Sequence, residues 1–357
     1  MAKITVPLHQ SELTGWCARF GLPSTIVKNH LKAVALKKVE HPIKKVLDKK
    51  WDGIKRVRQV ISCFNAQDPK LAQVILNTWF IGAIASIYEN KFSSKLVPII
   101  KGEQNYMKTS ALRRICALCE DSFLEGAELN PDSKDSVLSV ISSWITELGE
   151  LERTSKNCQG AIKAFITKET DTIRPPYAIS DIKKPRQTHL IGTVNGTSFL
   201  KDNTGNSRYA VISLAKPVNI KKLNKLLGWE YKNGRIERVN PELLIQFWLE
   251  VKEYYKQGKT WNLDQSKLSL LKDINNQYLE KNQYYRLLSE KYVCHSNTEG
   301  NMKYLKASEV CELESIDKCN AKQVGQALTV LVKEGKIESK KGRSNVVYYQ
   351  LKISVNH

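Results

Sequence analysis

The chain has 357 residues, of which 41% are hydrophobic and 26% are charged, as in globular proteins with two or three domains. Its 56 lysines and arginines exceed its 36 aspartates and glutamates, so the formal net charge is +20 and favours a polyanionic partner. No apolar run approaches the ~18 residues of a membrane span, so we expect nucleic acid and no membrane. Scattered cysteines and an N-terminus without a secretory apolar segment predict free thiols in the cytoplasm.

Residues 1–90 are predicted to form an N-terminal helical region. From His41 onward, apolar residues recur at helical spacing, which predicts one helix from Pro42, a second near 54–61 and a third over 71–88. Residues 1–38 carry mixed helical and loop signals, and no role is predicted for them.

The central feature of the sequence is an apolar segment at 96–100, followed by Gly102, by Lys108 and Thr109, and by a helix-favouring segment at 110–115. Strand, glycine-started loop, lysine, hydroxyl and helix form the frame of a phosphate-binding P-loop. The lysine would reach the β- and γ-phosphates, and the threonine hydroxyl would ligand Mg²⁺. The predicted nucleotide-binding residues are Gly102, Gln104, Asn105, Met107, Lys108, Thr109 and Ser110.

One position departs from the P-loop pattern, because Met107 stands where a glycine is usual. A glycine there allows a positive φ, which costs a residue with a Cβ about 1 kcal/mol or more. We therefore expect a positive φ at Met107 if the loop follows the usual path.

Two further segments predict strands that end in polar side chains. Residues 143–151 are apolar and carry Glu147 and Glu150, as a Walker B element does when it helps to hold Mg²⁺ and polarises the attacking water. Residues 187–195 end on Asn195, whose amide suits a group that hydrogen-bonds the attacking water or the γ-phosphate. Between them we expect a helix at 159–168 and a β-hairpin whose tip carries Lys183 and Lys184.

The order of these segments resembles the virulence-associated-protein-E (VirE-type) ATPases, relatives of superfamily 3 helicases and poxvirus-type primase-helicases. The resemblance covers about residues 41–260. It rests on the segments HP (41–42), KWDG (50–53), WFIGAIA (79–85), GEQNYMKTSALR (102–113), SKD (133–135), WITELGELE (144–152), KAFITKETDTIRPPY (163–177), PRQTHLIGTVN (185–195) and NSRY (206–209).

The resemblance implies an AAA-like, hexameric, ATP- and Mg²⁺-dependent ATPase that acts on DNA in replication of a phage or mobile element, beside a separate primase. Glu150, with Glu147 nearby, would take the Walker B role and ligand Mg²⁺ together with Thr109. Arg208 would be the finger that reaches a neighbouring subunit's γ-phosphate, although Ser207 replaces one member of the family's basic pair. The hairpin with Lys183 and Lys184 would grip a single strand in the central channel.

The C-terminal segment is predicted to be a separate module. Helices are expected at 305–313 and 321–334, followed by a strand, a basic turn and a strand. This is the order of a winged helix, which contacts duplex DNA through its second helix and its wing. Lys340, Lys341 and Arg343 are the predicted wing contacts.

The expected fold is an α/β AAA-like P-loop ATPase core with an N-terminal helical region and a C-terminal winged helix, divided at 1–90, 91–260 and 261–357. The leading hypothesis is a DNA-dependent ATPase that translocates on or melts DNA as a ring. The alternative is a DNA-binding initiator or adaptor whose P-loop has decayed at Met107 and which recruits another helicase. No carboxylate or histidine cluster at metal spacing points to a nuclease or primase.

Overall fold

The structure is a computed structural model that describes residues 5–27, 41–149, 156–173, 182–195, 208–265, 271, 283–294, 300–342 and 346–354. The chain forms two compact units. The first comprises Met1–Thr197 and Gly205–Gln277, and the second Ser198–Thr204 and Tyr278–His357. Each unit has its own hydrophobic core.

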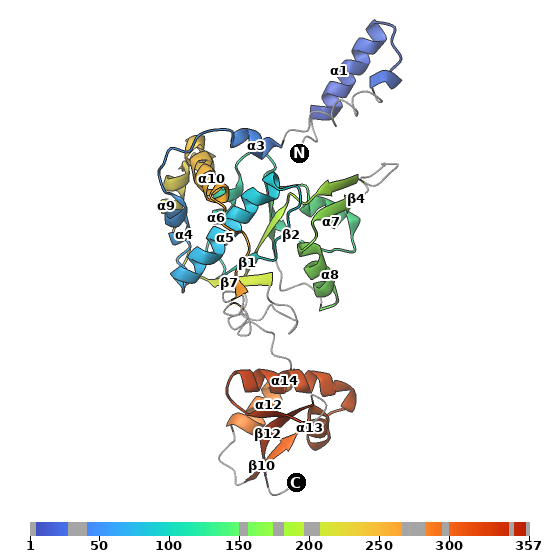
Figure 1. Ribbon diagram of the computed structural model, residues 1–357, viewed down its shortest axis with the longest axis vertical. Coiled ribbons are helices and arrows are strands. Elements are labelled where there is room, and N and C mark those ends of the chain that lie inside the picture. The colour runs from blue at the N-terminus through green and yellow to red at the C-terminus, as the bar shows by residue number, and fades with distance from the viewer. Residues whose placement is uncertain are drawn as a thin grey trace. The chain divides into compact units, whose positions relative to one another are not determined.

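A five-stranded parallel sheet in the order β2-β3-β6-β1-β7 forms the centre of the first unit (Figure 1). The strands are β1 Val97–Lys101, β2 Phe123–Ala127, β3 Ile145–Leu148, β6 His189–Val194 and β7 Tyr209–Ser213. Strands β1, β3 and β6 are nearly continuous buried runs, as expected for parallel strands covered on both faces. The α/β class is confirmed, as are the strands predicted at 96–100, 143–151, 187–195 and 209–214.

The first unit also contains helices and two small hairpins. The helices are α1 Thr5–Arg19, α3 Pro42–Val46, α4 Val57–Ser62, α5 Pro69–Tyr88, α6 Lys108–Cys116, α7 Lys134–Val140, α8 Lys156–Ile166, α9 Ile220–Leu227 and α10 Pro241–Lys256. One hairpin pairs β4 Thr170–Ile173 with β5 Ile182–Pro185, and the other pairs β8 Trp229–Lys232 with β9 Arg235–Arg238. The second hairpin was not predicted from the sequence.

Helix α5 joins the helical region to the sheet. It begins at Pro69, where the Asp68 side chain accepts a hydrogen bond from the amide of Leu71, and it packs on β1, β6, β7 and α10. The Phe80 ring lies edge-on to the rings of Phe247 and Trp248, with centroids 5.2 and 5.6 Å apart. Helices α3, α4 and α5 therefore share one core with the sheet.

Helix α5 is long and apolar enough to be compared with a membrane span. Its length and composition would allow it to cross a bilayer, with a mean hydropathy of 1.5 in its most apolar window. Within the first unit, however, 67% of that window is buried. Its apolar side chains pack in the core between the sheet and α10.

The second unit combines helices with an antiparallel sheet in the order β10-β12-β11. Its elements are α12 Gln283–Ser289, a π-helical turn Glu290–Cys294, β10 Gly300–Leu305, α13 Ala307–Leu313, a 3-10 turn Lys318–Asn320, α14 Ala321–Lys333, β11 Ser339–Lys341 and β12 Val347–Ser354. The two predicted helices and the predicted hairpin are confirmed. Strand β10 was missed because its partner, β12, lies about fifty residues further along the chain.

A buried ion pair closes the base of the β4–β5 hairpin, between Asp171 on β4 and Arg186 just after β5. The guanidinium of Arg186 donates to both oxygens of Asp171 at 2.8 and 2.6 Å, and both side chains are almost fully buried. We expect Asp171→Ala to lower the free energy of unfolding by about 3–5 kcal/mol, because it leaves a buried guanidinium without its counter-charge. Glu253→Ala, which removes an exposed pair with Lys256, should cost less than about 1 kcal/mol. Urea denaturation of both variants measures the difference, and equal costs would contradict the assignment.

Candidate functional site

The largest concentration of predicted site residues lies at the carboxyl edge of the parallel sheet. Strand β6 pairs with both β1 and β3, so the ends of these three strands meet at one edge. A cleft of about 560 Å³ opens there. It is lined by Gln104, Asn105, Tyr106, Met107, Lys108, Thr109, Ser110, Glu125, Gly126, Glu147, Gly149, Thr193, Val194 and Asn195.

The loop at 102–107 connects β1 to α6 and forms one wall of the cleft. A side chain at Gly102 would place its Cβ only 2.8 Å from Cδ2 of Tyr106, so the tight start of this loop requires glycine. Met107 has φ 60° and ψ 27°, which confirms the positive φ expected at this position. The conformation costs a residue with a Cβ about 1–2 kcal/mol, and the methionine side chain is 46% exposed.

Lys108 is the first residue of α6 and is buried although it carries a charge. Its Nζ donates to the carbonyl oxygens of Gly102 and Glu103 at 2.8 and 2.9 Å, and to Oδ1 of Asn195 at 2.7 Å. The contact between Lys108 and Asn195 joins the loop after β1 to the end of β6. The predicted lysine and the predicted amide therefore lie in one site.

Glu147 lies at the centre of the cleft and is fully buried on β3. Its Oε1 accepts hydrogen bonds from the hydroxyls of Thr109 at 2.6 Å and Thr193 at 2.8 Å. Its Oε2 is buried and has no hydrogen-bond partner among the described residues. Burial raises the pKa of this carboxyl, while the two threonine hydroxyls act in the opposite direction.

The chemistry of this group fits a magnesium ion. A threonine hydroxyl and a carboxylate are hard oxygen ligands of the kind that Mg²⁺ prefers, and Mg²⁺ keeps several waters when protein ligands are few. The unpartnered Oε2 of Glu147 offers an acceptor beside Thr109. The structure thus gives Glu147 the contact with Thr109, whereas the sequence had placed Glu150 first; Glu150 lies outside the described residues.

Sequence reasoning missed Thr193. It lies two residues before Asn195, and alternate residues of a strand point to the same face. That spacing is the signal that could have identified it. Glu125 and Gly126 could not be found in this way, because they reach the cleft only through the pairing of β2 with β3.

Arg208 does not line the cleft. It directly precedes β7, whose Tyr209 pairs with Val97 at the start of β1, so it lies at the amino edge of the sheet. Its Nε is buried without a hydrogen-bond partner among the described residues. Within one chain, this arginine and the cleft occupy opposite edges.

The expectation that Lys183 and Lys184 occupy a hairpin tip is wrong. Both lie within β5, opposite Thr172 and Asp171, because pairing continues through Ile173 and Ile182 and moves the connection to residues 174–181. Lys183 is exposed, whereas the Nζ of Lys184 donates to the carbonyl of Ile141 at 3.0 Å. Burial lowers the pKa of the Lys184 ammonium.

In the second unit, the predicted basic residues lie at the end of β11. Lys340 and Lys341 are exposed, and the Nζ of Lys340 lies 3.8 Å from the centroid of the Tyr304 ring. Arg343 lies outside the described residues. These residues belong to a different compact unit from the cleft.

Glu147→Gln tests the cost of the buried carboxyl. The pKa of Glu147 is higher in the folded than in the unfolded protein. The carboxyl therefore contributes stability that is fully present below its unfolded pKa and is lost as the pH rises through its folded pKa. We therefore expect the glutamine variant to unfold at a higher temperature than the parent at pH 8, by about 2–4 °C per kcal/mol of relieved desolvation. The gain should shrink toward pH 5. Thermal unfolding across this range measures it, with the exposed Glu128→Gln as control; a gain that does not depend on pH would refute the assignment.

Comparisons with known proteins give one family. Residues 43–280 match the virulence-associated protein E-like domain. A search of the curated proteins finds no match. Two solved apo structures of the NrS-1 C terminal region are 12% and 13% identical to this chain, each with a TM-score of 0.44, and each match covers 86% of this chain and 78% of the other.

The TM-scores lie below 0.5, so the assignment rests on the family match. That match runs from α3 to residues just before α12 and so spans the sheet, the cleft and α10. Because it extends over more than half of the 357 residues, the protein belongs to the virulence-associated protein E-like domain family.

Proposed function

We propose that the cleft binds ATP with Mg²⁺ and that the protein is an ATPase with a P-loop and an AAA-like core. The observation that carries this proposal is the meeting of Lys108, Thr109, Glu147 and Asn195 around one cleft, from three different strands or their loops. Hydrolysis of a nucleoside triphosphate needs a cation at the β/γ-phosphates, a metal ligand set and a group that orients water. The four side chains supply these three roles.

Each residue then has a defined task. Lys108 exchanges its contacts with loop carbonyls for phosphate oxygens, and Thr109 and Glu147 hold Mg²⁺, directly or through its waters. When bound, Mg²⁺ neutralises charge on the β- and γ-phosphate oxygens. Asn195 orients the attacking water, and Glu150 polarises it as the family resemblance implies.

The biological setting that we propose is DNA replication in a phage or mobile element. The +20 net charge favours a nucleic-acid partner, and the family resemblance implies a ring-shaped motor, a hexamer, working with a separate primase. Lys183, which is exposed on β5, would contact a single strand. The second unit, with its helices α13 and α14 and its three-stranded sheet, would act as a winged helix whose Lys340, Lys341 and Arg343 contact duplex DNA.

A second function is favoured by the left-handed Met107. Strain at this position, beside Lys108, would weaken nucleotide binding or turnover. The protein would then be a DNA-binding initiator or adaptor that recruits another helicase. The same variants distinguish the two functions.

The test is ATP hydrolysis with and without single-stranded DNA. We expect Lys108→Ala to lower turnover by at least about 100-fold, since the phosphates lose the loop's cation. Met107→Gly, the matched variant at the neighbouring position, should bind nucleotide as tightly as the parent or tighter, because glycine adopts φ 60° without strain. Turnover by Lys108→Ala at the parental rate would refute the nucleotide site. Absence of turnover in the parent together with gain in Met107→Gly would favour the adaptor.

Arg208 tests whether the site is completed by a neighbouring subunit. Because it lies at the sheet edge opposite the cleft, Arg208→Ala should retain nucleotide binding and lose turnover. Mixing it with Lys108→Ala should restore part of the activity, since some interfaces then pair an intact finger with an intact cleft. Loss of nucleotide binding in Arg208→Ala, or no recovery on mixing, would place this arginine elsewhere.

A further inference from the structure

A second and larger depression lies on the first unit, formed by elements that carry none of the candidate nucleotide residues. It has a volume of about 1030 Å³ and shares no lining residue with the cleft. Its walls are the segment around α4, the first turns of α5, the chain just after β7 and the end of α10. We call it the basic groove, because its lining includes Lys55, Arg58, Lys70, Lys216 and Lys259.

The carboxylate that lines the basic groove already has hydrogen-bond partners. Among the described residues, the groove's single lining carboxylate, Glu250, is fully buried and accepts from the backbone amides of Arg56 and Val57 at the start of α4. It also accepts from the hydroxyl of Tyr254. The hydrogen bonds of Glu250 thus come from backbone amides and a hydroxyl and not from the cations of the groove.

Four of the cations are free to bind a ligand. Within the described part of the chain, the side chains of Lys55, Arg58, Lys70 and Lys216 make no ion pair or hydrogen bond, and all four are exposed. The fifth, Lys259, places its Nζ 3.7 Å from the centroid of the Tyr254 ring. Exposed lysines scattered over a surface are ordinary, but here they converge on one concavity.

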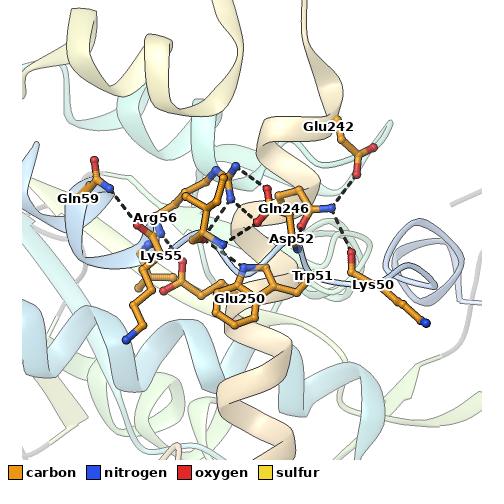
Figure 2. Close-up of polar contacts among 11 residues, drawn as sticks. Lys50, Trp51, Asp52, Lys55, Arg56, Gln59, Glu242, Gln246 and Glu250 are labelled. Atoms are coloured by element: carbon orange, nitrogen blue, oxygen red, sulfur yellow. Dashed lines mark hydrogen bonds and ion pairs between the residues drawn. The ribbon is translucent and has the colours of Figure 1, made fainter.

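The wall that carries Lys55 and Arg58 is rigidly attached. The guanidinium of Arg56 donates to both oxygens of Asp52, and the amide of Asp52 donates to Gln246 on α10 at 2.8 Å (Figure 2). Figure 2 shows the side chain of Lys55 extending away from this cluster. The KWDG segment thus fixes the backbone from which the groove's cations project.

The α5 wall of the groove carries polar side chains. Lys70, Gln73 and Asn77 follow one another at helical spacing on α5, so they form a polar row on an otherwise apolar helix. The amides of Gln73 and Asn77 have no hydrogen-bond partner among the described residues and are half-buried. Primary amides match the donor and acceptor edges of nucleic-acid bases.

We propose that the basic groove binds a single-stranded polynucleotide. Lys55, Arg58, Lys70 and Lys216 contact its phosphates, and Gln73 and Asn77 contact the Watson–Crick edges of bases, which only an unpaired strand exposes. A membrane surface is flat and would not enter a concave groove, and an acidic peptide has no base edges for the amides. The proposal does not depend on ATP hydrolysis in the cleft.

The test compares two triple variants with the same loss of charge. The groove variant is Lys55→Ala with Arg58→Ala and Lys70→Ala, and the control is Lys91→Ala with Lys95→Ala and Lys134→Ala, three exposed lysines outside the groove. Fluorescence anisotropy measures binding of a single-stranded and a duplex DNA oligonucleotide across a salt titration without nucleotide. For the single strand, we expect the groove variant to reduce the slope of log K against log salt by about 2, near 0.7 per lost contact, and the control to change it little.

A second variant separates base contacts from charge. Gln73→Ala with Asn77→Ala should weaken single-strand binding severalfold while leaving the salt slope unchanged. Equal losses of single-strand affinity in the groove and control variants would show that only net charge matters. A loss of affinity confined to duplex DNA would refute the single-strand assignment. Preserved DNA binding with lost binding of a polyglutamate peptide would identify an acidic protein partner instead. Parental binding by Lys108→Ala would show that the groove acts whether or not the cleft hydrolyses ATP.

Discussion

The parallel pairing of β6 with β1 on one side and β3 on the other is the constraint on which the candidate site depends. Because the strands are parallel, their carboxyl ends meet at one edge, and the loop after β1 faces the last residues of both neighbours. Lys108 can then reach Asn195, and Thr109 can reach Glu147, across separations of 87 and 38 residues. An exchange of β6 with another strand would separate Lys108 from Asn195.

The same edge concentrates unfavourable terms that the rest of the unit offsets. A buried glutamate with one unpartnered oxygen, a buried lysine and a left-handed methionine each oppose folding. The sheet is held against α5 and α10 by a core that contains Phe80, Phe247 and Trp248. Binding sites often retain groups that oppose folding and that a bound ligand would stabilise. In this protein, these unfavourable groups lie at the cleft.

The excess of positive charge is unevenly distributed. Lys108 faces the cleft, while five other cations line the basic groove. Among the described residues, the only carboxylate in the groove's lining accepts hydrogen bonds from backbone amides and a tyrosine hydroxyl. Lys340 and Lys341 belong to the second compact unit. The proposed motor would need contacts with DNA that are separate from the proposed nucleotide site, and this distribution of charge is compatible with that need.

Periodicity and turn chemistry act over a few residues, so local patterns in the sequence were sufficient to predict many single elements. These are the strands β1, β3, β6 and β7, the helices α5, α6, α10, α13 and α14, and the positive φ at Met107. They also placed Lys108 and Asn195 at the ends of the right strands. Long-range pairing decided the rest: Glu147 contacts Thr109, Thr193 shares its carboxylate, and Lys183 and Lys184 lie within β5 and not at a turn. The basic groove combines residues from 55 to 259, whose proximity no local pattern encodes because it arises from the packing of α4, α5 and α10.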